Sequence, residues 1–431
     1  MRVVACIAAS VAGAVIWSAS AAAAPVSPVG IRSPQLAVGA TGATVVAWER
    51  VRRRPFAIDV EARVGRAPDR LGRVVRVPGG RRPVVAAGAD GTAAVGWSTS
   101  GRPARVAIAR PGRALGRAEP LRGMDLLALA VQPNGRVVAV GLGGRGDSRV
   151  ERILRVALAR RGHGFGKSRA IGSVSFLHGL SMAVDPRDGA VVLVYRTPLT
   201  KGPTGGTGQA AVRVLAPTTA SFSPPTAVSD NEGYPVAVAG PGGAGVAFMA
   251  SPLGLISTAL SIARRSKDSW GPPELISTEP WAPVAPPACA GLSGYSATLP
   301  ADGSAVAAWG VHITSPCGGP FKDYEYHENR RVFASIAAPN SAFGGRFSLT
   351  PADADFGPPV SAAAGDEAFV AAAEHNGGRV WLARRAPGAG SFRRRRTLTR
   401  DGDGDVILAA GGAHVLVAYQ RNDRLQLKTV R

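Results

Sequence analysis

One short pattern of hydrophobic and polar positions returns along the whole chain. Its clearest copy is GADGTAAVGW at 88–97, where an Asp-Gly turn separates two runs of small or β-branched residues. Asp-Gly and Asn-Gly between apolar runs predict a tight hairpin, because these residues tolerate positive φ. Further copies end at Trp48, Gly141, Tyr195 and Trp309, and three looser ones end at Phe248, Ala373 and Tyr419. The sequence therefore predicts eight such hairpins, most of them capped by an aromatic residue.

A second hairpin is predicted after seven of the eight copies. It consists of a strand ending in Ala-Arg or Ala-Pro, a turn, and an aromatic residue or Leu that opens the next strand, as in Ala109-Arg110 followed by Leu115-Gly116. Each repeat then holds four short strands, A to D, with the copies spaced 44 to 64 residues apart. Four strands in a repeat of about this length indicate a β-propeller.

The last repeat ends in LQLKTVR and lacks a strand D, which the segment PVSPVG at 25–30 can supply. Pairing the two ends of the chain would close the ring and remove its open edges. We therefore predict an all-β protein: a β-propeller of eight four-stranded blades, with seven as the alternative, in one domain over 24–431. The aromatic residues at 48, 97, 195, 309 and 419 are expected to pack between blades.

Residues 1–23 are expected to be a secretory signal peptide, since Arg2 precedes the apolar run 3–17 and the small residues Ala21 to Ala23 fit a cleavage site. No later stretch is long and apolar enough for a membrane-spanning helix. This pattern predicts a secreted or cell-surface protein. The sequence leaves its oligomeric state open.

The charge is strongly basic, with 51 Lys and Arg against 29 Asp and Glu, a net of +22 that comes almost entirely from Arg. Such a charge attracts anionic surfaces and polymers, although a GC-rich coding bias gives the same composition. The Ala-Arg step predicts a partial ring of arginines on one face of the propeller, formed by Arg63, Arg110, Arg160, Arg264 and Arg384. Binding there would be driven by charge and weakened by salt, and specific nucleic-acid recognition is not expected.

The sixth repeat carries an insertion at about 275–332 in which aromatic and polar residues gather. The candidate ligand-binding residues are Trp281, Tyr295, His312, Tyr324, Tyr326, His327, Glu328 and Arg330. Cys289 and Cys317 flank the sixth hairpin, and in an exported protein such a pair favours a disulfide. Loops of this composition suit a glycan or peptide site; the alternative is an insertion that packs on its own blade.

The hairpins resemble those of secreted bacterial β-propellers of the sialidase-like or BNR-repeat kind, in which an Asp-Gly turn precedes an aromatic residue. Here Gly91 and Gly303 lie six residues before Trp97 and Trp309. No catalytic constellation is evident, so our leading hypothesis is a non-enzymatic protein that recognises a cell-envelope or extracellular glycan or polymer. One alternative is a glycoside hydrolase or polysaccharide lyase using Asp323, Glu325 or Glu328. Another is a structural envelope protein attached by charge.

The segment RDGDGD at 400–405 resembles the calcium-binding loops of FG-GAP-type propellers, with Asp401, Asp403 and Asp405 as candidate ligands. The alternative is a solvated turn, so calcium is a possible cofactor and no other is indicated. Two glycine-rich stretches, GPGGAG at 240–245 and GHGFGKS at 162–168, fall where turns are expected. We interpret both as turns rather than as nucleotide-binding loops, since no helix is predicted after them.

Overall fold

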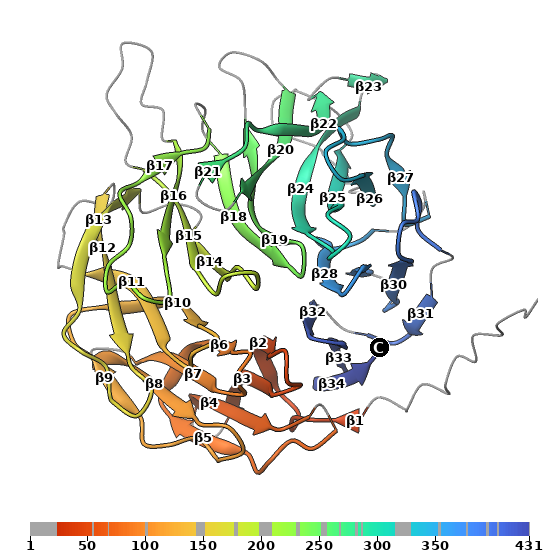
Figure 1. Ribbon diagram of the computed structural model, residues 1–431. Coiled ribbons are helices and arrows are strands. Elements are labelled where there is room, and N and C mark those ends of the chain that lie inside the picture. Colours follow the sequence, from red (N-terminus) through yellow and green to blue (C-terminus); the bar gives the residue numbers. More distant parts are fainter. Residues whose placement is uncertain are drawn as a thin grey trace, which may run out of the picture.

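The computed structural model describes residues 24–53, 56–67, 69–99, 102–143, 151–175, 180–197, 209–229, 233–250, 257–266, 269–280, 283–285, 288–314, 329–351, 355–375, 378–393, 396–402 and 405–430. Eight antiparallel sheets follow one another around a central axis, as expected for an eight-bladed β-propeller (Figure 1). Strand A of each blade lies next to the axis and strand D at the rim. In the described part of the chain there is no helix suited to crossing a membrane.

The first four blades take their strands A to D in chain order. They are β2 (Ile31–Val38), β3 (Thr44–Arg53), β4 (Phe56–Gly65) and β5 (Val75–Pro78); β6 (Gly80–Ala87), β7 (Ala93–Thr99), β8 (Arg102–Ala109) and β9 (Glu119–Leu121); β10 (Asp125–Val131), β11 (Val137–Gly143), β12 (Glu151–Ala159) and β13 (Arg169–Ser175); and β14 (Ser181–Val184), β15 (Val191–Arg196), β16 (Ala210–Leu215) and β17 (Thr226–Ala227).

The other four blades follow the same plan. They are β18 (Gly233–Gly240), β19 (Gly243–Ala250), β20 (Ser257–Ser266) and β22 (Glu274–Pro280), with β21 (Ser269–Trp270) pairing the end of β20; β24 (Ala288–Thr298), β25 (Ala305–Thr314), β26 (Asn329–Ala337) and β27 (Phe347–Ser348), with β23 (Pro283–Ala285) beside β24; β28 (Val360–Ala364), β29 (Glu367–Ala373), β30 (Val380–Arg385) and β31 (Arg396–Thr399); and β32 (Val406–Gly411), β33 (His414–Arg421) and β34 (Arg424–Thr429).

The eighth blade is completed by the other end of the chain, which confirms the predicted closure. Strand β1 (Ala24–Pro25) pairs with β34 in antiparallel register, Ala24 opposite Leu427. The Val26 amide donates to the Leu425 carbonyl at 2.9 Å, and the Leu425 amide donates to Ser27 Oγ at 2.7 Å. These bonds satisfy the edge of β34 and remove an exposed strand that could pair with another chain.

The aromatic residues that cap the hairpins pack between blades, as predicted. Trp48 and Trp309 are fully buried, and Trp97, Tyr195 and Tyr419 are nearly so. Trp48 packs against Leu416 and Leu425 of the blade before its own, while Trp97 does the same with residues of the first blade. The Ala- and Val-rich strands around them leave room for these large side chains, because an inner strand with small residues lets neighbouring sheets approach.

The turns between strands A and B behave as the sequence indicates. In five of them a glycine has positive φ, between 72° and 87°, at Gly42, Gly91, Gly135, Gly189 and Gly303. GPGGAG is the tight β18–β19 turn, and GHGFGKS forms the turn in which Phe165 bridges Ala159. Both stretches are therefore turns, as interpreted from the sequence.

Candidate functional site

The sixth-repeat loops fall largely outside the described residues. Positions 281 and 315–328 are not described, and neither are the side chains of His312, Arg330 and Cys289. The backbone of Cys289 pairs with Thr314, three residues before Cys317, so the disulfide stays a prediction. Tyr295 is described: it packs against the core between blades 5 and 6, and its hydroxyl donates to the Ala247 carbonyl at 3.4 Å. The ligand site proposed for these loops, and the acid–base carboxylates of the hydrolase alternative, stay predictions.

The aspartates of 400–405 are only partly described. Asp401 is exposed and accepts hydrogen bonds from Thr399 Oγ1 and, at 2.7 Å, from Arg421 Nε. These two bonds lower the pKa of the Asp401 carboxyl. Asp405 is exposed and Asp403 lies outside the described residues. Over the described ranges, no group of three or more acidic, His or Cys side chains is placed to hold a metal, and the calcium site stays a prediction.

The five arginines of the predicted ring do not share one equivalent position, because strand C ends at different points in different blades. The bridge that closes the C–D turn joins Ala109 to Leu115 in blade 2 but Gly65 to Leu71 in blade 1. The residue equivalent to Arg110 is therefore Arg66, and Arg63 lies three residues before it. Arg264 and Arg384 also lie further inside strand C than Arg110 does. Their carbonyls accept from Gly271 and Arg393, as the Ile108 carbonyl accepts from Gly116 in blade 2, so both correspond to Ile108.

This difference in position divides the arginines into two kinds. Three are half-buried and bonded to groups of the protein: Arg63 donates to the Gly72 carbonyl at 2.9 Å, Arg264 pairs with Glu274 at 2.7 Å, and Arg384 pairs with Glu367. Arg63 and Arg264 also donate to the carbonyls of Val26 and Gly303 in neighbouring blades. Arg110 and Arg160 are exposed in the C–D turns. The arginine-rich face is thus a local cluster rather than a ring.

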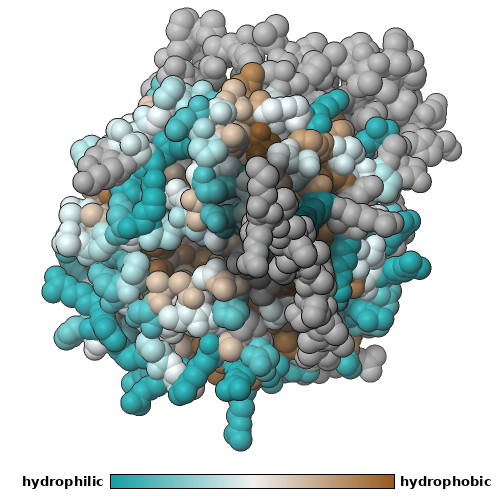
Figure 2. Space-filling model, turned by 45° about the vertical axis from the view of Figure 1, so that its right-hand side comes forward, coloured by the Kyte–Doolittle hydropathy of each residue, from teal (hydrophilic) through white to brown (hydrophobic). Residues whose placement is uncertain are grey.

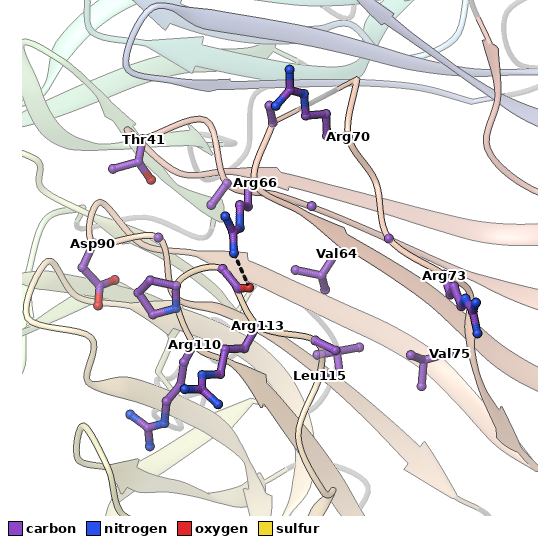
Figure 3. Close-up of a pocket in the computed structure, with 18 of the residues that line it drawn as sticks. Thr41, Val64, Arg66, Arg70, Arg73, Val75, Asp90, Arg110, Arg113 and Leu115 are labelled. Carbon is purple, nitrogen blue, oxygen red and sulfur yellow. Dashed lines mark hydrogen bonds between the residues drawn. The ribbon is translucent and has the colours of Figure 1, made fainter.

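That cluster surrounds a pocket of about 950 Å³ between blades 1 and 2 (Figure 3). Both C–D turns and both A–B turns of these blades contribute to it. Its charged lining consists of five arginines and two aspartates: Arg66, Arg70, Arg73, Arg110, Arg113, Asp69 and Asp90. Val64, Val75 and Leu115 are the branched apolar side chains of its lining. Arg66 extends from blade 1 to blade 2 and donates to the Gly112 carbonyl at 2.9 Å, which holds one edge of the pocket together (Figure 3).

The lining of this pocket carries an excess of positive charge, with five arginines against Asp69 and Asp90. Within the described part of the chain, none of its five arginines forms an ion pair. Asp90 is occupied by its own turn, accepting from the Thr92 amide at 3.0 Å and from Thr92 Oγ1 at 2.8 Å. Elsewhere arginines are paired, as Arg50 is with Glu61 at 3.0 Å and Arg265 with Asp185 at 2.8 Å. The unpaired guanidiniums make the pocket suited to binding oxyanions, which they contact through paired N–H donors.

Only Arg110 of this pocket was among the predicted site residues. The others come from RAPDRLGR at 66–73 and RPGR at 110–113, two arginine-rich turns in consecutive repeats. This concentration of arginine in two consecutive turns is the sequence feature from which the pocket could have been predicted. In the space-filling view hydrophilic side chains project from the lower edge of the molecule (Figure 2).

Comparisons with known proteins identify the fold. No family model matches the sequence, and no curated protein is significantly similar to it. Among solved structures the chain is similar to the BP39L lectin from Burkholderia pseudomallei, with a TM-score of 0.51 and 13% identity over 86% of this chain and 100% of that chain.

Two further similarities have lower TM-scores. For the polysaccharide lyase Uly1 the TM-score is 0.48, with 11% identity over 78% of this chain and 87% of that chain. For the β-propeller domain of the Trilobed protease from Pyrococcus furiosus it is 0.45, with 9% identity over 96% and 95% of the two chains. At 13% identity the similarity to the lectin supports the fold alone and leaves function to the site. The chain is an eight-bladed β-propeller, and the sialidase-like resemblance of its hairpins stays a prediction.

Proposed function

We propose that this protein binds acidic polysaccharides through the pocket between blades 1 and 2. The observation that carries this proposal is an excess of arginine around a cavity of about 950 Å³: five arginines line it against two aspartates, and none of the five forms an ion pair among the described residues. Leaving like charges close together costs free energy in the unliganded protein, and an anionic ligand removes that cost on binding. The expected export of the chain would place the pocket where such polymers occur.

The lining favours a polysaccharide over a nucleic acid. Proteins that bind single-stranded nucleic acids stack the bases on exposed aromatic side chains, and the described lining of this pocket has none. Carboxylate, sulfate or phosphate groups on sugars need only the guanidinium donors, with Val64, Val75 and Leu115 available to contact the sugar rings. The similarity to a lectin fold is compatible with this assignment, and the ligand chemistry rests on the arginines.

Replacing Arg70 and Arg113 together by Gln should weaken binding of a heparin-derived octasaccharide. The expected loss is at least about 100-fold, because two charge-assisted hydrogen bonds of about 1.5 kcal/mol or more each are removed. Isothermal titration calorimetry at several salt concentrations measures it, and the salt dependence should fall in the variant. The matched control is Arg161→Gln with Arg393→Gln, which removes the same charge at two exposed positions outside the pocket.

An equal loss in the control variant would assign the binding to net charge and overturn the proposal. Tighter binding of single-stranded DNA than of the octasaccharide, with the same dependence on Arg70 and Arg113, would overturn the ligand class. Neutral dextran should not bind at this pocket, because it carries no group for the guanidiniums to neutralise.

The sixth-repeat loops are tested in the same titrations with neutral glycans at about 500 mM salt, where charge-driven binding is screened. If they form the second ligand site predicted from the sequence, replacing Trp281, Tyr324 and His327 by Ala should abolish salt-resistant binding without unfolding the protein. Unchanged affinity in that triple variant would remove the loops from consideration.

A further inference from the structure

A second pocket lies directly beside the arginine pocket. It has a volume of about 350 Å³ and lies between strands β4 and β5 of blade 1 and strands β7 and β8 of blade 2. Val75 and Leu115 line both pockets. The two pockets are therefore adjacent along the seam between the blades, with Val75 and Leu115 between them.

The lining of this second pocket includes a tryptophan whose buried hydrogen-bond donor has no partner among the described residues. Trp97 is 3% exposed, and its indole Nε1 is buried with no acceptor among the described residues. The equivalent Trp48 in blade 1 is satisfied, because its Nε1 donates to Glu61 Oε2 at 3.0 Å. A buried donor left without an acceptor is destabilising, so a ligand oxyanion that reached the Trp97 indole would remove a cost that blade 1 does not have.

The cause of the difference is one position on strand C. Trp48 lies opposite Glu61 in the β3–β4 register, and Trp97 lies opposite Arg105 in the β7–β8 register. An arginine has donors only and cannot accept from the indole. Blade 2 therefore has a cation, Arg105, at the position where blade 1 has the carboxylate of Glu61. Arg102 also lines this pocket and adds a second positive charge.

We propose that the indole N–H of Trp97, with Arg105 and Arg102, binds a second acidic group of the same linear polysaccharide whose first acidic group lies in the arginine pocket. This inference rests on the proposed function, since it assigns a chain that spans both pockets rather than a single anion. The oxyanion takes the place that the Glu61 carboxylate occupies in blade 1. The ligand class is a linear polymer with acidic groups on successive units, such as a sulfated or uronic acid-containing glycan.

The experiment compares heparin-derived oligosaccharides of two to twelve sugars on the wild-type protein and on Arg105→Glu. This variant recreates the Trp–Glu pair of blade 1, so its fold is expected to be retained. In the wild type, affinity should rise as the chain becomes long enough to reach the second pocket. Arg105→Glu should lose about tenfold or more for the long oligosaccharides, the equivalent of one charge-assisted hydrogen bond, and keep the affinity of the disaccharide. Arg161→Glu is the control for net charge.

Nitrogen-15 NMR of the tryptophan side chains gives a readout independent of affinity. The Trp97 indole signal is identified as the one missing in Trp97→Phe, and it should shift with the long oligosaccharides and stay unchanged with the disaccharide. Affinity that depends on Arg70 and Arg113 but not on chain length or Arg105, with a fixed Trp97 signal, would overturn this inference and leave the proposed function intact.

Two other results would show whether the proposed function or only the ligand class of this inference is wrong. Absence of oligosaccharide binding at every length would overturn the proposed function and this inference together. A Trp97 shift with inorganic sulfate but with no oligosaccharide would overturn the polymer and identify the second pocket as a site for a free anion.

Discussion

Replacing Asp185 by Ala should lower the free energy of unfolding by about 3 kcal/mol, the cost of removing the buried one of the two carboxylates that pair with a buried arginine. Asp185 lies in the A–B turn of blade 4 and is fully buried. Its Oδ2 accepts from Arg265 of blade 5 at 2.8 Å and from Arg187 at 2.8 Å. Arg265 is 6% exposed and would keep only Asp188, also at 2.8 Å. Urea unfolding followed by intrinsic fluorescence measures the loss.

Two further variants define the cause. Asp125→Ala removes a carboxylate whose side chain is 71% exposed and should change stability little, since exposed ion pairs contribute about 0–1 kcal/mol. Replacing Asp185 by Leu and Arg265 by Met together should restore much of the stability, because no buried charge is then left alone. A double variant as unstable as Asp185→Ala would contradict this explanation.

The same contact gives a pH dependence with a definite sign. Burial acts to raise the pKa of Asp185, but the hydrogen bonds from Arg187 and Arg265 outweigh it and hold the pKa below its ordinary value of 3.8. A carboxyl with a lowered folded-state pKa stabilises the protein above its unfolded-state pKa and loses that contribution as the pH falls through the folded value. The stability difference between wild type and Asp185→Ala should therefore be constant at neutral pH and shrink below about pH 4.

Replacing Gly240 by Ala should lower the free energy of unfolding by about 3 kcal/mol, because an added methyl group cannot be accommodated between two backbones. A Cβ at this position would lie 2.2 Å from the Leu299 carbonyl oxygen of the next blade and within 3.0 Å of two further backbone atoms. Neither strand can withdraw, since each is held by its own sheet. Urea unfolding followed by intrinsic fluorescence measures this loss of stability as well.

Gly345→Ala is the matched control, because a Cβ there would meet nothing within 4 Å. Gly39 and Gly411 occupy the corresponding ends of strand A, with Cβ positions 2.2 Å and 2.4 Å from backbone oxygens of neighbouring blades. Their Ala variants should behave like Gly240→Ala. Similar stabilities for Gly240→Ala and Gly345→Ala would show that the inner strands separate easily, in conflict with close packing around the axis.

The hairpin pattern by itself determined the fold. The Asp-Gly and Asn-Gly turns, the runs of small or β-branched residues beside them and the missing strand D of the last repeat indicated eight blades and a ring closed by the chain ends. These features are local, because a turn residue sets its own φ and a strand exposes alternate residues to alternate faces. The burial of Trp48, Trp309 and the other capping aromatics followed from the same repeat.

The candidate site was decided only by the tertiary structure. Strand β4 continues to Gly65, which moves Arg63 into the sheet and brings Arg66 to the position equivalent to Arg110. The arginine pocket forms because the turns of two consecutive blades meet, and the unpartnered Trp97 depends on Arg105 standing opposite it. The register and the position of each turn depend on how the strands pair. A shift of one residue in the pairing moves every side chain of a strand to the other face of the sheet. A repeat pattern indicates which strands exist, and the pairing of those strands determines which charged side chains meet.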